Sequence, residues 1–211
     1  MCIRKTKIQA VIFDLDGTLA HSALLTMAAL RLAAPQFGLP LPAEDTVRRT
    51  IGYANPTFYF KLFPDVPRDL TLALGAFVEQ EELRLLPSFG HKLLFPGCRD
   101  LLLHLNKRGI ACHIASTGEV PHVYGILETT GIVGLFDQIA CGSPDKFDML
   151  RKLIASQGPH SAIMVGDMKK DYEAAKANGI LSIGACYGYC QRARTAFDLY
   201  IDSPYELLEM V

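Results

Sequence analysis

The chain has 211 residues, of which half are hydrophobic and a fifth are charged, and its 21 Lys and Arg nearly balance its 22 Asp and Glu. A chain of this length and composition buries a core without disulfides, which excludes a disordered protein. The near-neutral charge argues against a nucleic-acid-binding surface, and no apolar stretch reaches the ~18 residues of a membrane span. We expect an untargeted, cytoplasmic protein, because Asp14 and Asp16 interrupt the N-terminal apolar run before it reaches the length of a signal peptide.

The first predicted element is a strand. The apolar run IQAVIF at residues 8–13 ends at Asp14, Asp16 and Gly17. Side chains two apart in an extended chain point the same way, and Gly17 permits a turn that leaves backbone amides free. Two converging carboxylates suit a hard cation such as Mg²⁺. The alternative for a single Asp at this position is a helix cap or a turn residue.

Residues 20–91 have a different character. They are rich in Leu, Ala and Phe at helical spacing, as at Leu70, Leu74 and Phe77, and prolines interrupt them repeatedly. This pattern predicts about four short helices. Basic and acidic residues are nearly equal in number here, so the segment is not a clamp for a polyanion. We expect it to form a lid.

Strands and helices alternate in the rest of the chain. The apolar runs at residues 109–115, 161–165 and 179–185 lack polar alternation, which predicts strands covered on both faces. Helical patterns lie at residues 98–109, 120–131, 146–158 and 169–179, with Gly109 and Gly179 as predicted C-terminal caps. The alternation predicts a doubly wound, Rossmann-like α/β fold with a parallel sheet, in which ligands bind at the carboxyl ends of the strands.

Polar residues follow the later strands as well. Ser116 and Thr117 open a helix, where hydroxyls and free amides suit a phosphate; simple N-capping is the alternative. Asp167 and Asp171 are spaced to bring a second acidic pair to the same edge. Four Asp at one edge would repel one another unless a cation lay among them.

Lys146 begins a predicted helix, where its charge opposes the helix dipole. This unfavourable placement indicates that its side chain serves a group outside the helix. A solvated surface lysine is the alternative, and Lys152, Lys169 and Lys170 are rivals for the same role.

Four motifs, in this order and spacing, resemble those of the haloacid dehalogenase-like hydrolase superfamily. They are the run Asp14-Leu15-Asp16-Gly17-Thr18-Leu19, the pair Ser116-Thr117, Lys146, and Gly166-Asp167-x-x-x-Asp171. The resemblance covers nearly the whole chain, and MVGDMKKDYEAAKANGILSIGACYGY is similar to the phosphoglycolate phosphatase-like branch. It implies a discontinuous α/β core of residues 1–19 and 92–211 and an inserted all-helical cap of residues 20–91.

The resemblance also implies roles. Asp14 would be the nucleophile, Asp16 the general acid and base, and Lys146 the group that neutralises the phosphoryl charge. Mg²⁺ would be held by Asp14, by the backbone carbonyl of Asp16 and by Asp167, with Asp171 orienting that shell. The phosphoryl group would contact Ser116, Thr117 and Gly17, and Arg49 of the cap would meet the substrate.

The implied function is magnesium-dependent hydrolysis of a small phosphorylated metabolite, phosphoglycolate-like or a sugar or nucleotide monophosphate, through an aspartyl-phosphate. Asp16 would then need a raised pKa to act as an acid. The alternatives are a β-phosphoglucomutase-like isomerase and a non-catalytic protein that binds a phosphorylated ligand. We expect no nucleic-acid or membrane partner, and a monomer or a homodimer.

The six cysteines are scattered, which predicts reduced thiols rather than a disulfide framework. Cys186 and Cys190 are the pair whose spacing leaves a redox role open.

Overall fold

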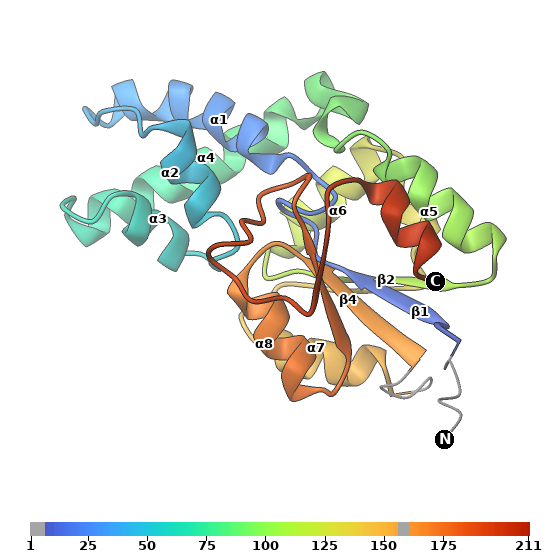
Figure 1. Cartoon of the computed structure of the whole chain (residues 1–211). Coiled ribbons are helices and arrows are strands. Elements are labelled where there is room, and N and C mark those ends of the chain that lie inside the picture. Colours follow the sequence, from blue (N-terminus) through green and yellow to red (C-terminus); the bar gives the residue numbers. More distant parts are fainter. Residues whose placement is uncertain (1–6, 156–160) are drawn as a thin grey trace.

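A six-stranded parallel sheet forms the centre of the protein in the computed structural model, which describes residues 7–155 and 161–211. The strand order is β3-β2-β1-β4-β5-β6 (Figure 1). The strands are β1 Ala10–Phe13, β2 Ala111–Ala115, β3 Gln138–Ala140, β4 Ala162–Gly166, β5 Leu181–Ala185 and β6 Leu199–Ile201. This confirms the predicted doubly wound fold. The order changes direction at β1, where such folds bind ligands.

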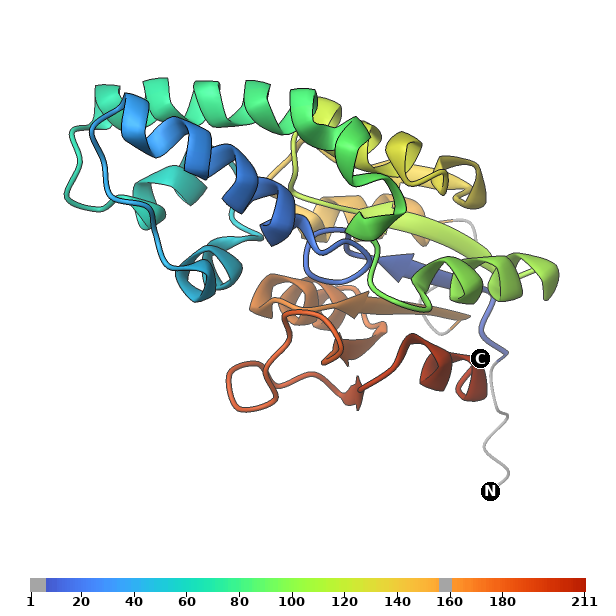
Figure 2. The same ribbon diagram turned by 90° about the horizontal axis from the view of Figure 1, so that it is seen from above.

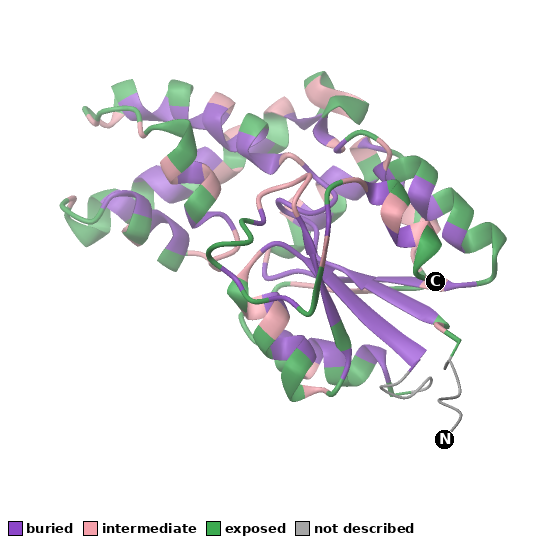
Figure 3. Cartoon of the chain, in the orientation of Figure 1, coloured by how far each residue is buried: buried purple, intermediate pink, exposed green. Residues whose placement is uncertain are grey.

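Helices cover both faces of the sheet (Figures 1 and 2). Alternate residues of β1 face opposite sides: Val11 and Phe13 pack in one apolar cluster, and Ala10 and Ile12 pack in another. The first cluster includes residues of α5 Cys98–Lys107 and α6 Val120–Thr129, and the second includes residues of α7 Lys146–Leu153 and α8 Lys169–Ala177. The strands β1, β2, β4 and β5 are therefore almost entirely buried (Figure 3), which explains their unbroken apolar sequences.

The predicted helical segment lies to one side of the sheet (Figures 1 and 2). Its helices are α1 Ser22–Gln36, α2 Glu44–Thr50, α3 Thr57–Leu62 and α4 Arg68–Phe89. Leu30, Phe58 and Leu74 belong to an apolar cluster that these helices share, whereas Leu25 and Leu86 belong to a cluster of the sheet. The start of α1 and the end of α4 thus anchor the segment to the sheet. The division into a core of residues 1–19 and 92–211 and a cap of residues 20–91 stays a prediction.

Several short elements were not predicted. β3 and β6 lie at the two edges of the sheet and have three residues each, and 3₁₀ turns cover Gly90–Leu93, Val133–Leu135 and Pro204–Glu209. The end of the helix predicted over residues 146–158 lies outside the described residues. Within residues 7–155 and 161–211, the helices are too short or too polar for a membrane span.

The described cysteines are free thiols, and Cys2 lies outside the described residues. Burial raises the pKa of both Cys98 and Cys112 to about 12. It also raises the pKa of Cys186 and Cys190, which lie close enough to interact. These thiols are poor nucleophiles at neutral pH.

Candidate active site

The register of the sheet brings the predicted polar residues to one edge. Phe13, the last residue of β1, pairs with Ile114 of β2 and with Val165 of β4. The amide of Asp14 donates to the Val165 carbonyl at 2.9 Å, which extends the ladder by one residue. Asp14, Ser116 and Asp167 therefore follow three adjacent strands at their carboxyl ends.

Lys146 joins two of the predicted carboxylates. Its Nζ lies 2.7 Å from Asp14 Oδ1 and 2.5 Å from Asp171 Oδ1, and its side chain is 4% exposed. The rivals Lys152 and Lys169 are exposed, and Lys170 Nζ stacks over the Tyr53 ring at 5.0 Å. The geometry therefore favours Lys146 among these lysines as the partner of Asp14.

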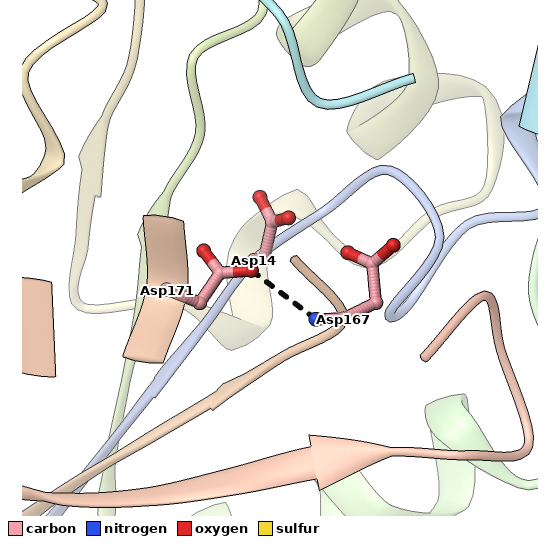
Figure 4. A group of neighbouring side chains, drawn as sticks. All are labelled: Asp14, Asp167 and Asp171. Atoms are coloured by element: carbon pink, nitrogen blue, oxygen red, sulfur yellow. Dashed lines mark hydrogen bonds between the residues drawn. The ribbon is translucent and has the colours of Figure 1, made fainter. Parts of the chain in front are cut away.

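Asp14, Asp167 and Asp171 form a buried group of carboxylates (Figure 4). Each offers an oxygen within 4.8 Å of the others. Burial raises the pKa of Asp14 to about 7, with Asp171 and Asp16 adding to the effect and Lys146 opposing it. Burial, together with Asp14 and Asp171, also raises the pKa of Asp167 well above its ordinary value. One lysine does not neutralise this group.

The donor set fits a hard divalent cation. Asp167 Oδ2 is buried and accepts no hydrogen bond from any described residue. Asp171 is already satisfied, because its Oδ2 accepts from the amides of Asp167 at 3.1 Å and Met168 at 2.9 Å while its Oδ1 faces Lys146. Asp14 and Asp167 are thus the better ligands, and Asp171 fixes the loop and the lysine beside them. Oxygen ligands of this kind suit Mg²⁺.

Asp16 points to a different set of partners. Its Oδ1 lies 2.9 Å from His122 Nε2, and His122 Nδ1 lies 3.3 Å from Glu82 Oε2. Glu82 Oε1 accepts from the Thr26 hydroxyl at 2.6 Å. A polar chain of four side chains thus runs from the edge of the sheet to helices α4 and α1.

The expectation of a raised pKa for Asp16 is wrong in this structure. Burial raises the pKa of Asp16, but the charge of His122 and its hydrogen bond lower it more, so the net direction is downward. Burial alone would lower the pKa of His122, but the carboxylates of Asp16 and Glu82 raise it well above its ordinary value. Asp16 is therefore held as a carboxylate beside an imidazolium.

A cavity of about 150 Å³ opens beside Asp16. It is lined by Asp16, Thr117 and His122 and by residues of α3, α4 and the loop before α3, with Asn55 and Glu79 among them. The cavity thus lies between the sheet edge and the predicted cap, where a small molecule would meet both.

Ser116 and Thr117 are both buried, and their hydroxyls make different contacts. Ser116 Oγ accepts from the Gly118 amide at 3.0 Å, whereas Thr117 donates to the Gly52 carbonyl at 3.1 Å. The structure thus ties Thr117 to the helical segment and leaves Ser116 as part of the loop at the edge.

Gly17 turns the chain as predicted, with φ +81°. A Cβ at this position would lie 2.5 Å from the Tyr189 ring and 2.7 Å from Asp167 Oδ2, so a side chain would be strained and would force its neighbours to shift. Its amide, however, donates to the Ala20 carbonyl at 2.8 Å. The amide of Gly17 itself is thus used within the turn, and the contact of this turn with a phosphoryl group stays a prediction.

Arg49 is not brought to the cavity beside Asp16. Its side chain is half exposed and pairs with Asp45. It lines a second cavity of about 310 Å³, which Asp167, Arg48 and Arg194 also line. The second cavity is thus rich in basic side chains and lies on the Asp167 side of the edge.

His122, Glu79 and Glu82 were missed from the sequence. Glu82 could have been noticed, because it interrupts a row of apolar residues at four-residue spacing on α4. The buried apolar residues of this row are Leu74, Val78 and Leu86. The sequence signal for His122 was weaker: it is the third residue of the helix that follows Ser116 and Thr117, and this helix begins beside the site.

Comparisons with known proteins identify the relatives of this chain. The profile of the haloacid dehalogenase-like hydrolases matches residues 8–179. A phosphoglycolate phosphatase from Synechococcus elongatus is 29% identical over 97% of this chain and 97% of its own. These matches confirm the predicted resemblance.

Two solved structures have the same fold. A predicted phosphoglycolate phosphatase from Haemophilus somnus superposes with a TM-score of 0.84 at 21% identity, covering 96% of this chain and 97% of its own. A haloacid dehalogenase-like family hydrolase from Streptococcus pneumoniae superposes with a TM-score of 0.83 at 24% identity, covering 96% and 98%.

Proposed function

The chain belongs to the haloacid dehalogenase-like hydrolase family, and on that premise we propose that it is a magnesium-dependent phosphatase acting on a small phosphorylated metabolite. The observation that carries the proposal is the buried group of Asp14, Lys146, Asp167 and Asp171, with Asp16 facing a cavity beside it. Phosphoryl transfer needs this combination of a nucleophile, cations and a proton carrier.

Asp14 acts as the nucleophile in this proposal. Its Oδ1 is held by the Leu15 amide at 2.8 Å and by Lys146 at 2.7 Å, which fixes the carboxylate in place. One carboxylate oxygen of Asp14 forms a bond to phosphorus as the bond to the leaving oxygen breaks, giving an aspartyl-phosphate. Lys146 offsets the charge of both groups, which would otherwise repel by roughly 4 kcal/mol per pair of unit charges at ~4 Å.

Asp14 and Asp167 would hold Mg²⁺ together with the backbone carbonyl of Asp16, and Asp171 would orient them. When bound, the ion supplies further charge neutralisation between the carboxylates and the phosphoryl oxygens. The buried, unpartnered Oδ2 of Asp167 supports this assignment.

Asp16 and His122 manage the proton. His122 Nε2 lies 2.9 Å from Asp16 Oδ1. In the first step the proton that His122 carries passes through Asp16 to the leaving alkoxide, which is expected in the cavity beside them. In the second step Asp16, which His122 holds as a carboxylate, takes a proton from the water that attacks the aspartyl-phosphate. Ser116 and Thr117 complete the walls of the phosphoryl site.

The test is release of inorganic phosphate from a panel of phosphorylated metabolites, with Mg²⁺ and with EDTA. We expect turnover that requires Mg²⁺ and is lost in Asp14→Asn. Asp69→Asn, an exposed position in the first turn of α4, is the matched control and should retain full activity. Full activity of Asp14→Asn, or turnover in EDTA, would refute the mechanism.

The same assay separates the isomerase alternative. Conversion of a sugar phosphate into its isomer without phosphate release would indicate a β-phosphoglucomutase-like reaction.

Cytoplasmic location and a monomeric or homodimeric state stay predictions.

A further inference from the structure

The cavity beside Asp16 is lined by several carboxylates, and we infer that the substrate is a phosphate monoester of a small uncharged alcohol that bears a further hydroxyl group. The inference rests on the proposed phosphatase function and specifies the leaving group. It sets this chain apart from a phosphatase whose leaving alcohol carries a carboxylate, as in phosphoglycolate.

The position of Asp16 decides where the alcohol lies. The Asp16–His122 pair, which delivers the proton in the proposed mechanism, must lie within hydrogen-bond reach of the leaving oxygen. Asp16 lines the first cavity, together with Thr117, whereas Asp167 lines the second. The alcohol therefore occupies the first cavity rather than the basic second cavity.

The charges of the first cavity disfavour an acid. Four carboxylates line it, those of Asp16, Glu79, Glu82 and Glu119. His122 is the cationic side chain among the lining residues that the structure describes, and neither Lys nor Arg is among them. Since His122 lies between Asp16 and Glu82, its charge is already matched. A carboxylate on the leaving group would meet like charges without a partner.

The inner carboxylates already have donors, which favours a hydroxyl over an ammonium group. Glu82 accepts from Thr26 at 2.6 Å and faces His122, and Glu79 accepts from the Asn55 amide at 2.7 Å. Burial and the neighbouring Glu82 raise the pKa of Glu79, because both oppose a charge at this position. A carboxyl group has lone pairs left after one or two such bonds. These lone pairs accept hydrogen bonds from hydroxyls.

The size and the apolar wall agree with a small carbon skeleton. Ile51, Phe58 and Leu83 supply apolar surface to the cavity. Its volume of about 150 Å³ is close to that of an engineered cavity that admits benzene. A skeleton of about two to six carbons fits this space, whereas a nucleoside does not.

A series of two-carbon esters tests the inference, because its members differ in one terminal group: 2-hydroxyethyl phosphate, phosphoglycolate and phosphoethanolamine. We expect kcat/KM for 2-hydroxyethyl phosphate to exceed that for phosphoglycolate by ~10-fold or more. A small repulsion between the carboxylates of the cavity and the carboxylate of phosphoglycolate is enough to lower kcat/KM by each factor of ten. A preference for phosphoglycolate would overturn the inference, and a preference for phosphoethanolamine would overturn the choice of an uncharged alcohol.

Two variants of α4 test whether the carboxylates of the first cavity cause the preference for the uncharged ester. Glu79→Gln should raise kcat/KM for phosphoglycolate several-fold and narrow its gap to the uncharged ester. Glu81→Gln, on the same helix but outside the cavity, is the matched control and should leave the ranking unchanged. If phosphoglycolate were preferred and that preference vanished in Arg49→Ala, the leaving group would lie in the second cavity and the inference would fail.

Binding separates this inference from the phosphatase proposal. If no ester, including p-nitrophenyl phosphate, released phosphate, the phosphatase proposal would fail. Calorimetric binding of the same three esters to Asp14→Asn in Mg²⁺ needs no turnover and still ranks them. Tightest binding of 2-hydroxyethyl phosphate supports the inference, and any other order overturns it.

Discussion

Replacing Asp167 by Asn should stabilise the metal-free protein while removing its response to Mg²⁺. Three carboxylates lie within 4.8 Å of one another around a single lysine. Asp167 is 3% exposed, and its Oδ2 accepts no hydrogen bond from the described residues. An amide at this position carries no charge and donates to the neighbouring carboxylates, so it relieves the repulsion.

The magnitude follows from burial. A buried polar group without a partner costs about 1–3 kcal/mol, and more when it is charged. In a protein of this size each kcal/mol shifts Tm by roughly 2–4 °C. We therefore expect Tm of Asp167→Asn in EDTA at pH 8 to exceed that of the wild type by ~3–10 °C.

The effect should depend on pH with a definite sign. Raised pKa values mean that Asp14 and Asp167 favour the folded state in their protonated forms. The stability that they contribute is present below pH 4 and is lost as the pH rises through about 7, the pKa of Asp14. For Asp14 the rise of the pKa from 3.8 to about 7 corresponds to a preference of the folded state for the protonated carboxyl of roughly 4 kcal/mol. The advantage of Asp167→Asn should thus shrink at pH 4.5.

Thermal denaturation at pH 4.5 and pH 8, in EDTA and in Mg²⁺, checks these expectations. Mg²⁺ should raise Tm of the wild type at pH 8 because it binds the folded state, and should hardly change that of Asp167→Asn. Asp69→Asn is the control and should behave as the wild type throughout. A variant less stable than the wild type in EDTA at pH 8, or one equally stabilised by Mg²⁺, would refute the reasoning.

Three further outcomes are expected. His122→Gln should lower kcat by ~10- to 100-fold with little change in KM, because it removes a partner of the proton carrier rather than of the substrate; equal changes in both would contradict this. Gly17→Ala should lower the free energy of unfolding in urea by ~1–3 kcal/mol, since its Cβ would meet Tyr189 at a positive φ. Cys98 and Cys112 should resist thiol reagents at pH 8 in the native protein and react after denaturation, because burial raises the pKa of both to about 12.

The sequence predicted the sheet well where strands are buried on both faces. β1, β2, β4 and β5 were predicted because their apolar runs end at polar residues, and the parallel register then placed Asp14 and Asp167 at one edge. β3 and β6 were not, because a three-residue strand at the edge of a sheet has too few buried side chains to leave a pattern. The predicted nearness of Lys146 to the carboxylates agrees with the structure, although its role stays a prediction.

The side chains around Asp16 were beyond sequence reasoning for a different reason. His122 lies on α6, Glu82 on α4 and Thr26 on α1, so their meeting depends on how the helical segment packs against the sheet. No local pattern records a contact between residues that are 40 or more positions apart. Arg49 shows a related limit: the resemblance implied a substrate contact, which stays a prediction, and the sequence did not show that α2 would present this side chain to the second cavity.

The pKa of Asp16 depends both on its burial and on contacts with residues that are distant in the sequence. The expectation of a raised pKa followed from burial beside other carboxylates, and burial does act in that direction. The lowering comes from His122, which in turn carries its charge because Glu82 of α4 lies beside it. The acidity of Asp16 therefore depends on the placement of a helix outside the sheet. If α4 moved away, His122 would lose one of the two carboxylates that hold its proton, and the pKa of Asp16 would rise toward the value that burial favours.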